Sequence, residues 1–257
     1  MAAYDFDAPR LFIDGPLALG RRIGLERAQA NYLLNVLRLK AGDDVLVFNG
    51  RDGEWRGQVH VEGRKSGDLL LVQQTRAQTP APELLYLFAP LKHARLDYLV
   101  QKAVEMGAGR LQPVLTRRTQ SARINLERMR ANVIEAAEQC GILAVPDVDA
   151  EQPLQRALDA LDETRILVFC DEDAPVADPI AALKAAPEGP LAVLIGPEGG
   201  FSPEERDLLL ARPNIVRLSL GPRILRADTA AVAALAVVQA ARGDWQGASP
   251  SGADVRP

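Results

Sequence analysis

Cysteine and histidine are scarce in this chain. Only two cysteines, Cys140 and Cys170, and two histidines, His60 and His93, occur among the 257 residues. Because the cysteines are far apart in the sequence and histidines are few, neither a zinc site nor a disulfide framework is supported. We expect both thiols to be buried and apolar, and we expect no metal ion.

Long apolar runs are also missing. No segment approaches the roughly 18 to 20 consecutive apolar residues of a membrane span. The first seven residues, which include Asp5 and Asp7, do not resemble a secretory signal. We therefore expect a cytoplasmic protein whose length suits one large or two modest domains.

An excess of positive charge is absent as well. The formal net charge is −4, which by itself argues weakly against an RNA ligand. Residues 1–150 carry 20 Lys/Arg against 18 Asp/Glu, whereas residues 151–257 carry 10 against 16. Any RNA-contacting surface is therefore expected in the first part, which holds a basic run made of Arg117, Arg118, Arg123, Arg128 and Arg130.

Short strand patterns separated by turns occupy the first third of the chain. Strands are predicted at residues 10–13, 44–48, 54–61 and 68–74, with one helical stretch near residues 26–37. We interpret residues 1–78 as a small β-barrel. Pro80 and Pro82 then interrupt any sheet ladder and mark a domain boundary.

From Glu83 onward, strand and helix patterns alternate. Strands are predicted at residues 84–91, 110–115, 165–170, 191–195 and 215–220, and helices at residues 96–106, 125–140, 203–210 and 229–241. Such alternation predicts an α/β domain over residues 83–242, with a mostly parallel sheet. The final helix is rich in alanine and valine, which suggests burial on more than one side and a subunit interface. Residues 243–257 are rich in Gly, Ser and Pro and are predicted to be disordered.

Two glycine-rich turns, within Leu194–Ser202 and Leu218–Thr229, are the most informative local feature. Each follows a buried-strand pattern and precedes a helix start, so both are expected at carboxyl ends of strands, where open α/β sheets bind ligands. The glycine spacing matches neither the dinucleotide fingerprint nor the P-loop. The apolar second turn suits an uncharged aromatic group such as adenosine. The alternative is that the glycines only allow the backbone to turn tightly between strand and helix.

These turns resemble the G-P-E-G-G-F-S and L-G-P-R-I-L-R segments of the bacterial 16S ribosomal RNA (uracil-N3)-methyltransferases of the SPOUT class. Further matching segments are Asn31–Arg38, Gln101–Gly107 and Glu135–Cys140. The resemblance implies a PUA-like β-barrel followed by a SPOUT domain with a deep trefoil knot. It also implies a homodimer that uses S-adenosyl-L-methionine to methylate N3 of a uridine in 16S rRNA within the 30S subunit.

The resemblance also implies site residues. Backbone and apolar groups for the cofactor are expected from Ile195, Gly196, Gly199, Gly200, Leu218, Leu220, Gly221, Ile224 and Leu225. Arg226 is expected to stabilise the charge that spreads onto O2 and O4 when N3 loses its proton. Two roles are open for Asp228, namely capping of the final helix and acceptance of that proton. RNA phosphate contacts are expected from Arg38, Lys92, Arg117, Arg118 and Arg123.

The sequence departs from the family pattern at three places. Asn31 stands where histidine is frequent, Gly141–Leu143 stand where an arginine is frequent, and Asp228 replaces glutamate. Tyr32 is expected to stack on a base or join the barrel core, whereas Phe48 and Trp55 are expected in that core. A ribose 2′-O-methyltransferase of the same superfamily and a non-catalytic ribosome-assembly factor remain alternatives.

Overall fold

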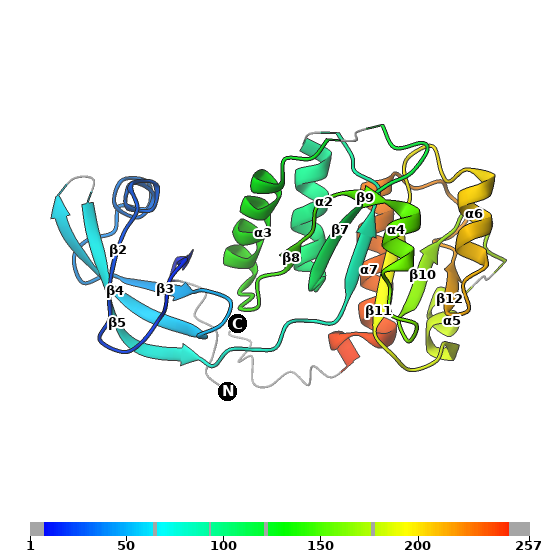
Figure 1. Cartoon of the computed structure of the whole chain (residues 1–257). Coiled ribbons are helices and arrows are strands. Elements are labelled where there is room, and N and C mark those ends of the chain that lie inside the picture. Colours follow the sequence, from blue (N-terminus) through cyan, green and yellow to red (C-terminus); the bar gives the residue numbers. More distant parts are fainter. Residues whose placement is uncertain (1–7, 64–65, 93, 121–122, 176–177, 247–257) are drawn as a thin grey trace. The chain divides into compact units, whose positions relative to one another are not determined.

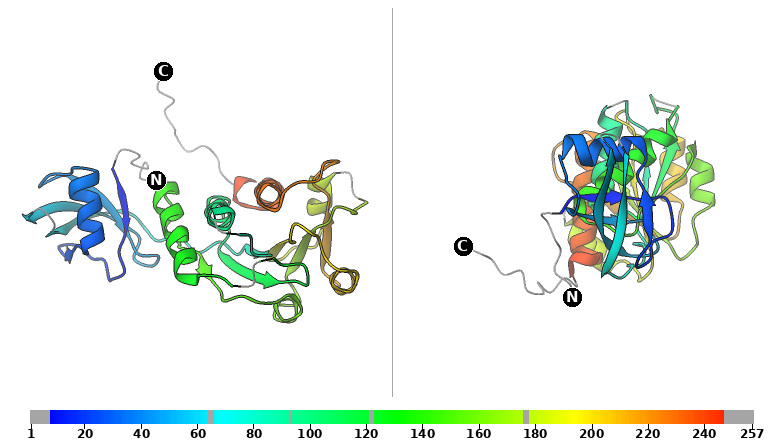
Figure 2. Two further views of the ribbon diagram at one scale, coloured as in Figure 1. Left: turned by 90° about the horizontal axis from the view of Figure 1, so that it is seen from above. Right: turned by 90° about the vertical axis from the view of Figure 1, so that its left-hand side faces the viewer.

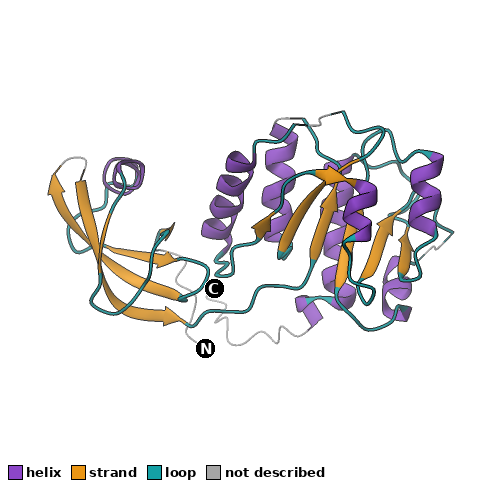
Figure 3. Cartoon of the chain, in the orientation of Figure 1, coloured by secondary structure: helices purple, strands orange, loops and turns teal. Residues whose placement is uncertain are grey.

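The computed structural model describes residues 8–63, 66–92, 94–120, 123–175 and 178–246 of the chain. The chain divides into two compact units, drawn as ribbons in Figures 1 and 3. The first comprises Met1–Ala81 with Ala137–Val145, and the second comprises Pro82–Ala136 with Pro146–Pro257. None of the described helices is long and apolar enough to cross a membrane.

The first unit is built on a five-stranded sheet with the order β1-β3-β4-β5-β2. Its strands are β1 (Arg10–Phe12), β2 (Arg22–Gly24), β3 (Asp44–Phe48), β4 (Glu54–Gly63) and β5 (Ser66–Arg76). Val45, Val59 and Leu71 belong to its apolar core. The four predicted strands are confirmed, and β2 is additional because three residues are too few to show an alternation pattern.

The helix predicted near residues 26–37 forms in two parts. Helix α1 (Arg27–Ala30) continues as a π-helical turn, η1 (Asn31–Val36). Tyr32 is 38% exposed, and the turn is followed by Arg38, whose φ of 59° lies in the left-handed region. Both π-helical turns and left-handed non-glycine residues are uncommon, and π-helical turns recur at functional sites. Phe48 is fully buried in the first unit, as predicted.

Arg10 caps the last turn of helix α3 (Leu126–Cys140). Its guanidinium donates to the carbonyls of Ala137 at 2.5 Å and Glu138 at 3.0 Å, and it lies over the Phe48 ring. The carboxylate of Glu54 accepts from Arg10 at 3.0 Å. The free carbonyls of a helix C-terminus favour such a cation, which explains why residues 137–145 group with the first unit.

The second unit contains a seven-stranded sheet whose described strand pairs are all parallel. The order is β12-β10-β11-β6-β7-β8, with β9 also paired to β7. The strands are β6 (Leu85–Phe88), β7 (Arg110–Leu115), β8 (Asp147–Val148), β9 (Gln152–Pro153), β10 (Ile166–Cys170), β11 (Leu191–Ile195) and β12 (Ile215–Leu218). The predicted parallel sheet is confirmed, and the two-residue strands β8 and β9 are additional.

Helices cover both faces of this sheet (Figure 2). Besides α3 they are α2 (Ala94–Glu105), α4 (Leu154–Asp159), α5 (Pro179–Ala185), α6 (Pro203–Leu210) and α7 (Ala227–Arg242). Leu87 of β6 packs with Leu158 of α4 and Leu209 of α6. Since side chains alternate along a strand, its neighbours Tyr86 and Phe88 face the other side, where α2 and α7 lie. Helices α4 and α5 were not predicted, because six or seven residues show too little of the helical period.

The starts of α6 and α7 bear on two expectations about helix capping. Helix α6 begins with the expected capping box, in which the N–H of Ser202 donates to Glu205 at 2.9 Å. Helix α7 begins at Ala227 with Arg226 as its N-cap residue, so Asp228 is not the N-cap. The carboxylate of Asp228 instead forms an ion pair with Arg95 of helix α2.

A short helix follows α7. Asp244–Gln246 form a short 3₁₀ helix (η2), contrary to the predicted disorder. The side-chain amide of Gln246 donates to the carbonyls of Ala240 and Ala241, which holds this turn on the end of α7. The rest of the predicted disordered tail, residues 247–257, lies outside the described residues.

Candidate functional site

A cavity of about 410 Å³ lies at the carboxyl ends of strands β10, β11 and β12. These strands are neighbours in the sheet, so the loops that follow them meet at one edge. The lining comes from residues 169–173, 195–201, 218–221 and 223–225, with Arg118, Arg206, Ala227 and Ala230. Both glycine-rich turns therefore line a single cavity.

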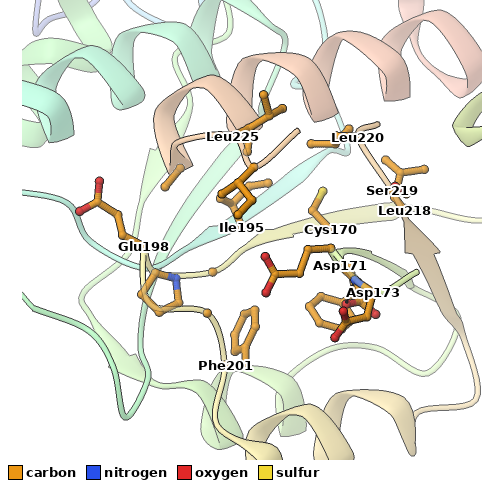
Figure 4. Close-up of a pocket in the computed structure, with 18 of the residues that line it drawn as sticks. Cys170, Asp171, Asp173, Ile195, Glu198, Phe201, Leu218, Ser219, Leu220 and Leu225 are labelled. Carbon is orange, nitrogen blue, oxygen red and sulfur yellow. Dashed lines mark hydrogen bonds between the residues drawn. The ribbon is translucent and has the colours of Figure 1, made fainter. Parts of the chain in front are cut away.

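The cavity has an apolar half and a charged half (Figure 4). The side chains of Ile195, Leu220 and Leu225 lie on the side nearer helix α7. The carboxylates of Asp171 and Asp173 lie on the opposite side. An apolar wall with a few converging polar groups is typical of small-molecule sites.

The first glycine-rich turn is tightly packed. A Cβ atom on Gly196 would lie 2.5 Å from the ring of Phe201, which packs edge-to-face on Phe169 with ring centroids 5.3 Å apart. Gly200 has a φ of 67°, and its N–H donates to the carbonyl of Pro197 at 2.9 Å. Gly196 is thus required by a close contact and Gly200 by a left-handed backbone.

The second turn depends on glycine for another reason. An added Cβ on Gly221 would meet no atom within 4 Å, but its φ of 98° is one that other residues rarely adopt. Ile224 lines the cavity although the residue is 92% exposed. This turn therefore presents apolar surface both to the cavity and to the surroundings of the molecule.

Arg95 joins the first turn to helix α7. Its Nε and Nη2 donate to the carboxylate of Asp228 at 2.9 and 3.1 Å, and its Nη1 donates to Glu198. Hydrogen bonds from Arg95, assisted by the N–H of Thr229, hold the pKa of Asp228 below its ordinary value. No motif points to Arg95, because its partners follow 103 and 133 residues later in the chain.

Asp171, which is buried at the end of β10, is the centre of a second ion-pair cluster. Arg206 of α6 donates to its carboxylate with both Nη atoms, at 2.6 and 2.9 Å, and Nε of Arg217 on β12 donates at 2.7 Å. Burial raises the pKa of Asp171, but the hydrogen bonds from the two arginines outweigh it and lower the pKa. This cluster ties together the ends of two strands and the start of α6 at the cavity wall.

The two cysteines differ in environment. Cys140 is exposed, so the prediction that it is buried was wrong. Cys170 is half-buried and lines the cavity. Burial, together with the nearby charge of Asp171, raises the pKa of its thiol to about 12, so the thiol is protonated and a poor nucleophile.

Every residue predicted to hold a cofactor lines the cavity. They are Ile195, Gly196, Gly199, Gly200, Leu218, Leu220, Gly221, Ile224 and Leu225. Arg226 and Asp228 do not line the cavity themselves. Arg226 stands in the chain between the lining residues Leu225 and Ala227, and Asp228 directly follows Ala227. Arg226 is exposed.

The predicted RNA-binding residues are distributed over both units. Arg118 lines the cavity, and its Nη1 donates to the carbonyl of Gly199 at 2.7 Å. Arg117 is held by α6, through Glu204 at 2.8 Å and Glu205 at 2.7 Å. Lys92 and Arg123 are exposed and follow β6 and β7, and Arg38 is exposed in the first unit.

Comparison with known proteins identifies the family. The model of an RNA methyltransferase domain matches residues 78–239, and that of an RNA methyltransferase PUA domain matches residues 25–72. Ribosomal RNA small subunit methyltransferase E of Rickettsia conorii is 31% identical over 232 residues, which are 90% of this chain and 94% of that protein. The chain belongs to this family.

Two solved structures extend the likeness. Ribosomal RNA small subunit methyltransferase E of Neisseria gonorrhoeae, bound to S-adenosyl methionine, is 27% identical with a TM-score of 0.78, covering 91% of this chain and 97% of that chain. A Legionella pneumophila protein, in complex with the same cofactor, is 27% identical with a TM-score of 0.79, covering 91% and 98%. As a member of this family, the chain is an rRNA methyltransferase with a PUA-like unit and an α/β RNA methyltransferase unit.

Proposed function

We propose that this chain transfers a methyl group from S-adenosyl-L-methionine to N3 of a uridine in 16S rRNA, uridine 1498 by resemblance to its family. Family membership supports the reaction class. The observation that carries the proposal is the single cavity lined by both glycine-rich turns, with Arg226 beside it. Each part of the proposal assigns a task to residues of this chain.

The cavity suits S-adenosyl-L-methionine, which supplies an electrophilic methyl group on its sulfonium when bound. Ile195, Leu220 and Leu225 offer apolar surface to the adenine ring. The turns at Gly196 and Gly221 are assigned to supply backbone N–H and C=O groups to the polar edge of this ring. A nucleotide with several phosphates would instead require a glycine-rich phosphate loop, which neither turn provides.

Arg226 is assigned to stabilise the reacting base. The lone pair of N3 is free to attack only after the imide loses its proton, and the resulting negative charge spreads onto O2 and O4. A guanidinium placed at these oxygens favours the anion. Within the described part of the chain, the side chain of Arg226 makes no hydrogen bond or ion pair, so it is available for the substrate.

Asp228 is the second residue assigned to catalysis. Arg95 keeps its carboxylate ionised and lowers its pKa, and a carboxylate of low pKa is a weak proton acceptor. We therefore assign the larger contribution to Arg226. Asp228 orients Arg95, and through it Glu198 of the first turn, and its capacity as a base is measured by the Asp228→Asn variant described below.

RNA binding is assigned to basic residues on both units. Lys92, Arg117, Arg118 and Arg123 follow β6 and β7, whose carboxyl ends lie at the cavity edge of the parallel sheet. Arg38 is assigned a further contact from the first unit. The exposed Tyr32 of the preceding turn η1 offers a ring to an unpaired base. Phosphate contacts of this kind supply affinity without sequence specificity.

We further propose a cytoplasmic homodimer that acts on the assembled 30S subunit and whose SPOUT-type unit carries the deep trefoil knot of its family. Support for the dimer comes from α7, where Val232 and Val237 are only half-buried among alanines, and from the exposed Ile224. Apolar side chains left at the surface mark interfaces when they form a continuous patch.

The decisive experiment incubates the protein with 30S subunits from cells that lack this methylation and with isotopically labelled cofactor. Mass spectrometry of the nucleosides is expected to give N3-methyluridine at one position. A 2′-O-methylated nucleoside would instead identify a ribose methyltransferase. Absence of labelled nucleoside, with 30S binding intact, would indicate a non-catalytic assembly factor.

A further inference from the structure

Glu172 is an exposed acidic residue of the cavity wall whose charge acts on Arg206 without forming a close ion pair with it. It follows the buried Asp171 and lines the cavity. Its carboxylate makes no hydrogen bond or ion pair within the described residues. Its Oε1 lies 3.9 Å from the place that a Cβ on Gly200 would take. A carboxylate acceptor therefore reaches from the loop after β10 toward the first glycine-rich turn.

The backbone on both sides of Glu172 is held in place. The N–H of Asp173 donates to the carboxylate of Asp171 at 3.1 Å, and the carbonyl of Asp173 accepts from Nη2 of Arg217 at 2.7 Å. The N–H of Ala174 donates to the carbonyl of Asp171 at 3.1 Å. Because Asp171 is itself fixed by two arginines, the loop presents the Glu172 side chain from a rigid base.

A carboxylate accepts hydrogen bonds and donates none, so the ligand must offer polar hydrogens at this position. Adenine is assigned to the apolar half, and the ribose is the next group along the cofactor. Its adjacent 2′ and 3′ hydroxyls can each donate a hydrogen bond, one to each oxygen of a single carboxylate. An acidic side chain near a strand end serves the same purpose in dinucleotide-binding α/β sheets.

We propose that Glu172 binds the ribose hydroxyls of the cofactor and that the Asp171–Arg206–Arg217 cluster positions it. This inference rests on the proposed use of S-adenosyl-L-methionine. It adds a specificity-determining residue outside both glycine-rich turns, contributed by the loop after β10.

Calorimetry with the full chain tests the inference through three ligands. S-adenosyl-L-methionine carries the sulfonium charge and the amino acid, S-adenosyl-L-homocysteine lacks the sulfonium charge, and 5′-methylthioadenosine keeps the ribose but lacks both. We expect Glu172→Ala to weaken all three by a similar factor of about 10 to 100, the scale of hydrogen bonds to a charged group. Glu172→Gln is expected to lose less, because the amide oxygen still accepts one hydrogen bond.

Asp207→Asn is the control. It removes a carboxylate from helix α6, but Asp207 is exposed and does not line the cavity, and we expect little change in affinity. The ligand-free melting temperature of Glu172→Ala is expected to match the wild type, because no described group pairs with this carboxylate.

Other outcomes overturn the inference. If Glu172→Ala lowers the affinity only for the two ligands that carry the amino acid, Glu172 binds the amino-acid end. If it lowers the affinity only for S-adenosyl-L-methionine, Glu172 acts only by attracting the sulfonium cation. Unchanged affinity for all three would make Glu172 a solvated side chain. If the wild type binds none of them, the proposed cofactor fails and the inference fails with it; a failure of Glu172→Ala alone leaves the proposed function intact.

Discussion

Arg226 and Asp228 stand two positions apart in very different electrostatic settings. The guanidinium of Arg226 is exposed, whereas the carboxylate of Asp228 is held by the fork of Arg95. A group whose charge is already satisfied by a neighbour changes its protonation reluctantly. The two side chains are therefore expected to respond differently to substitution.

We predict that Arg226→Ala preserves the melting temperature and cofactor affinity but lowers single-turnover methyl transfer by about 100- to 1,000-fold, the scale of losing one electrostatic stabiliser. Asp228→Asn keeps a side-chain acceptor for Arg95 but removes a base, and its loss is expected to be smaller. Rates are measured on 30S subunits across pH. An equally large loss with Asp228→Asn, at normal cofactor affinity, would identify Asp228 as the base.

Asp171 gives a prediction on stability against pH. Its ordinary pKa of 3.8 applies to the unfolded chain, and its folded pKa is lower. Its contribution is therefore complete above the unfolded pKa and is lost as pH falls through the folded pKa. The pKa values of Asp228 and Glu54 are also lowered in the folded protein. We expect the free energy of unfolding to be nearly constant above about pH 6 and to fall below about pH 4.

The Asp171→Asn variant checks this assignment by urea unfolding at several pH values. At neutral pH it is expected to lose about 1–3 kcal/mol, because Arg206 and Arg217 lose their shared anion. Its acid branch is expected to be shallower than that of the wild type. An acid branch of unchanged slope would show that other carboxylates account for the pH dependence.

The two glycine-rich turns are the elements that shape the cavity, and their glycines are not equivalent. Gly196 is required by the Phe201 ring, Gly221 by its backbone angle, and Gly199 by neither, since an added Cβ there would lie 3.5 Å from Arg118 in ordinary contact. Substitution effects are thus expected to follow local geometry, although all three glycines belong to the same motifs.

We predict that Gly196→Ala and Gly221→Val lower cofactor affinity, the first by displacing Phe201 into the cavity and the second by straining the turn. Strain of this kind costs about 1–3 kcal/mol. Gly199→Ala is the control and is expected to bind cofactor as the wild type does. Calorimetry and thermal melting measure both effects. Equal tolerance of all three substitutions would contradict the packing account.

At the scale of the whole molecule, basic side chains follow β6 and β7 at the cavity edge of the sheet, although the net charge of the chain is −4. Charge distribution therefore matters more than total charge for RNA binding. Arg118 differs from its neighbours, because it also donates to Gly199 at the cavity.

We predict that replacing Arg117 and Arg123 with glutamine weakens RNA binding. The slope of log affinity against log salt is expected to become shallower by about one unit for each phosphate that is no longer neutralised. Cofactor affinity is expected to stay unchanged, whereas Arg118→Gln is expected to affect both ligands. Arg110→Gln is the control, since Arg110 pairs with Asp149 at the opposite end of β7. An unaltered salt slope in the double variant would show that Arg117 and Arg123 face solvent and do not contact RNA phosphates.

Local pattern alone determined the strands β3, β7 and β11, the capping box of α6 and the two turns at strand ends, because each depends on residues a few positions apart. The nine predicted cofactor residues were named from the family resemblance of these two segments, and all nine line the cavity. Arg95 and Asp171 could not be predicted, nor could the displacement of Asp228 from the N-cap. Their partners come from other strands and helices, and the order β12-β10-β11 brings those partners together. An ion pair forms where folded elements meet, and that meeting is decided only by the tertiary structure.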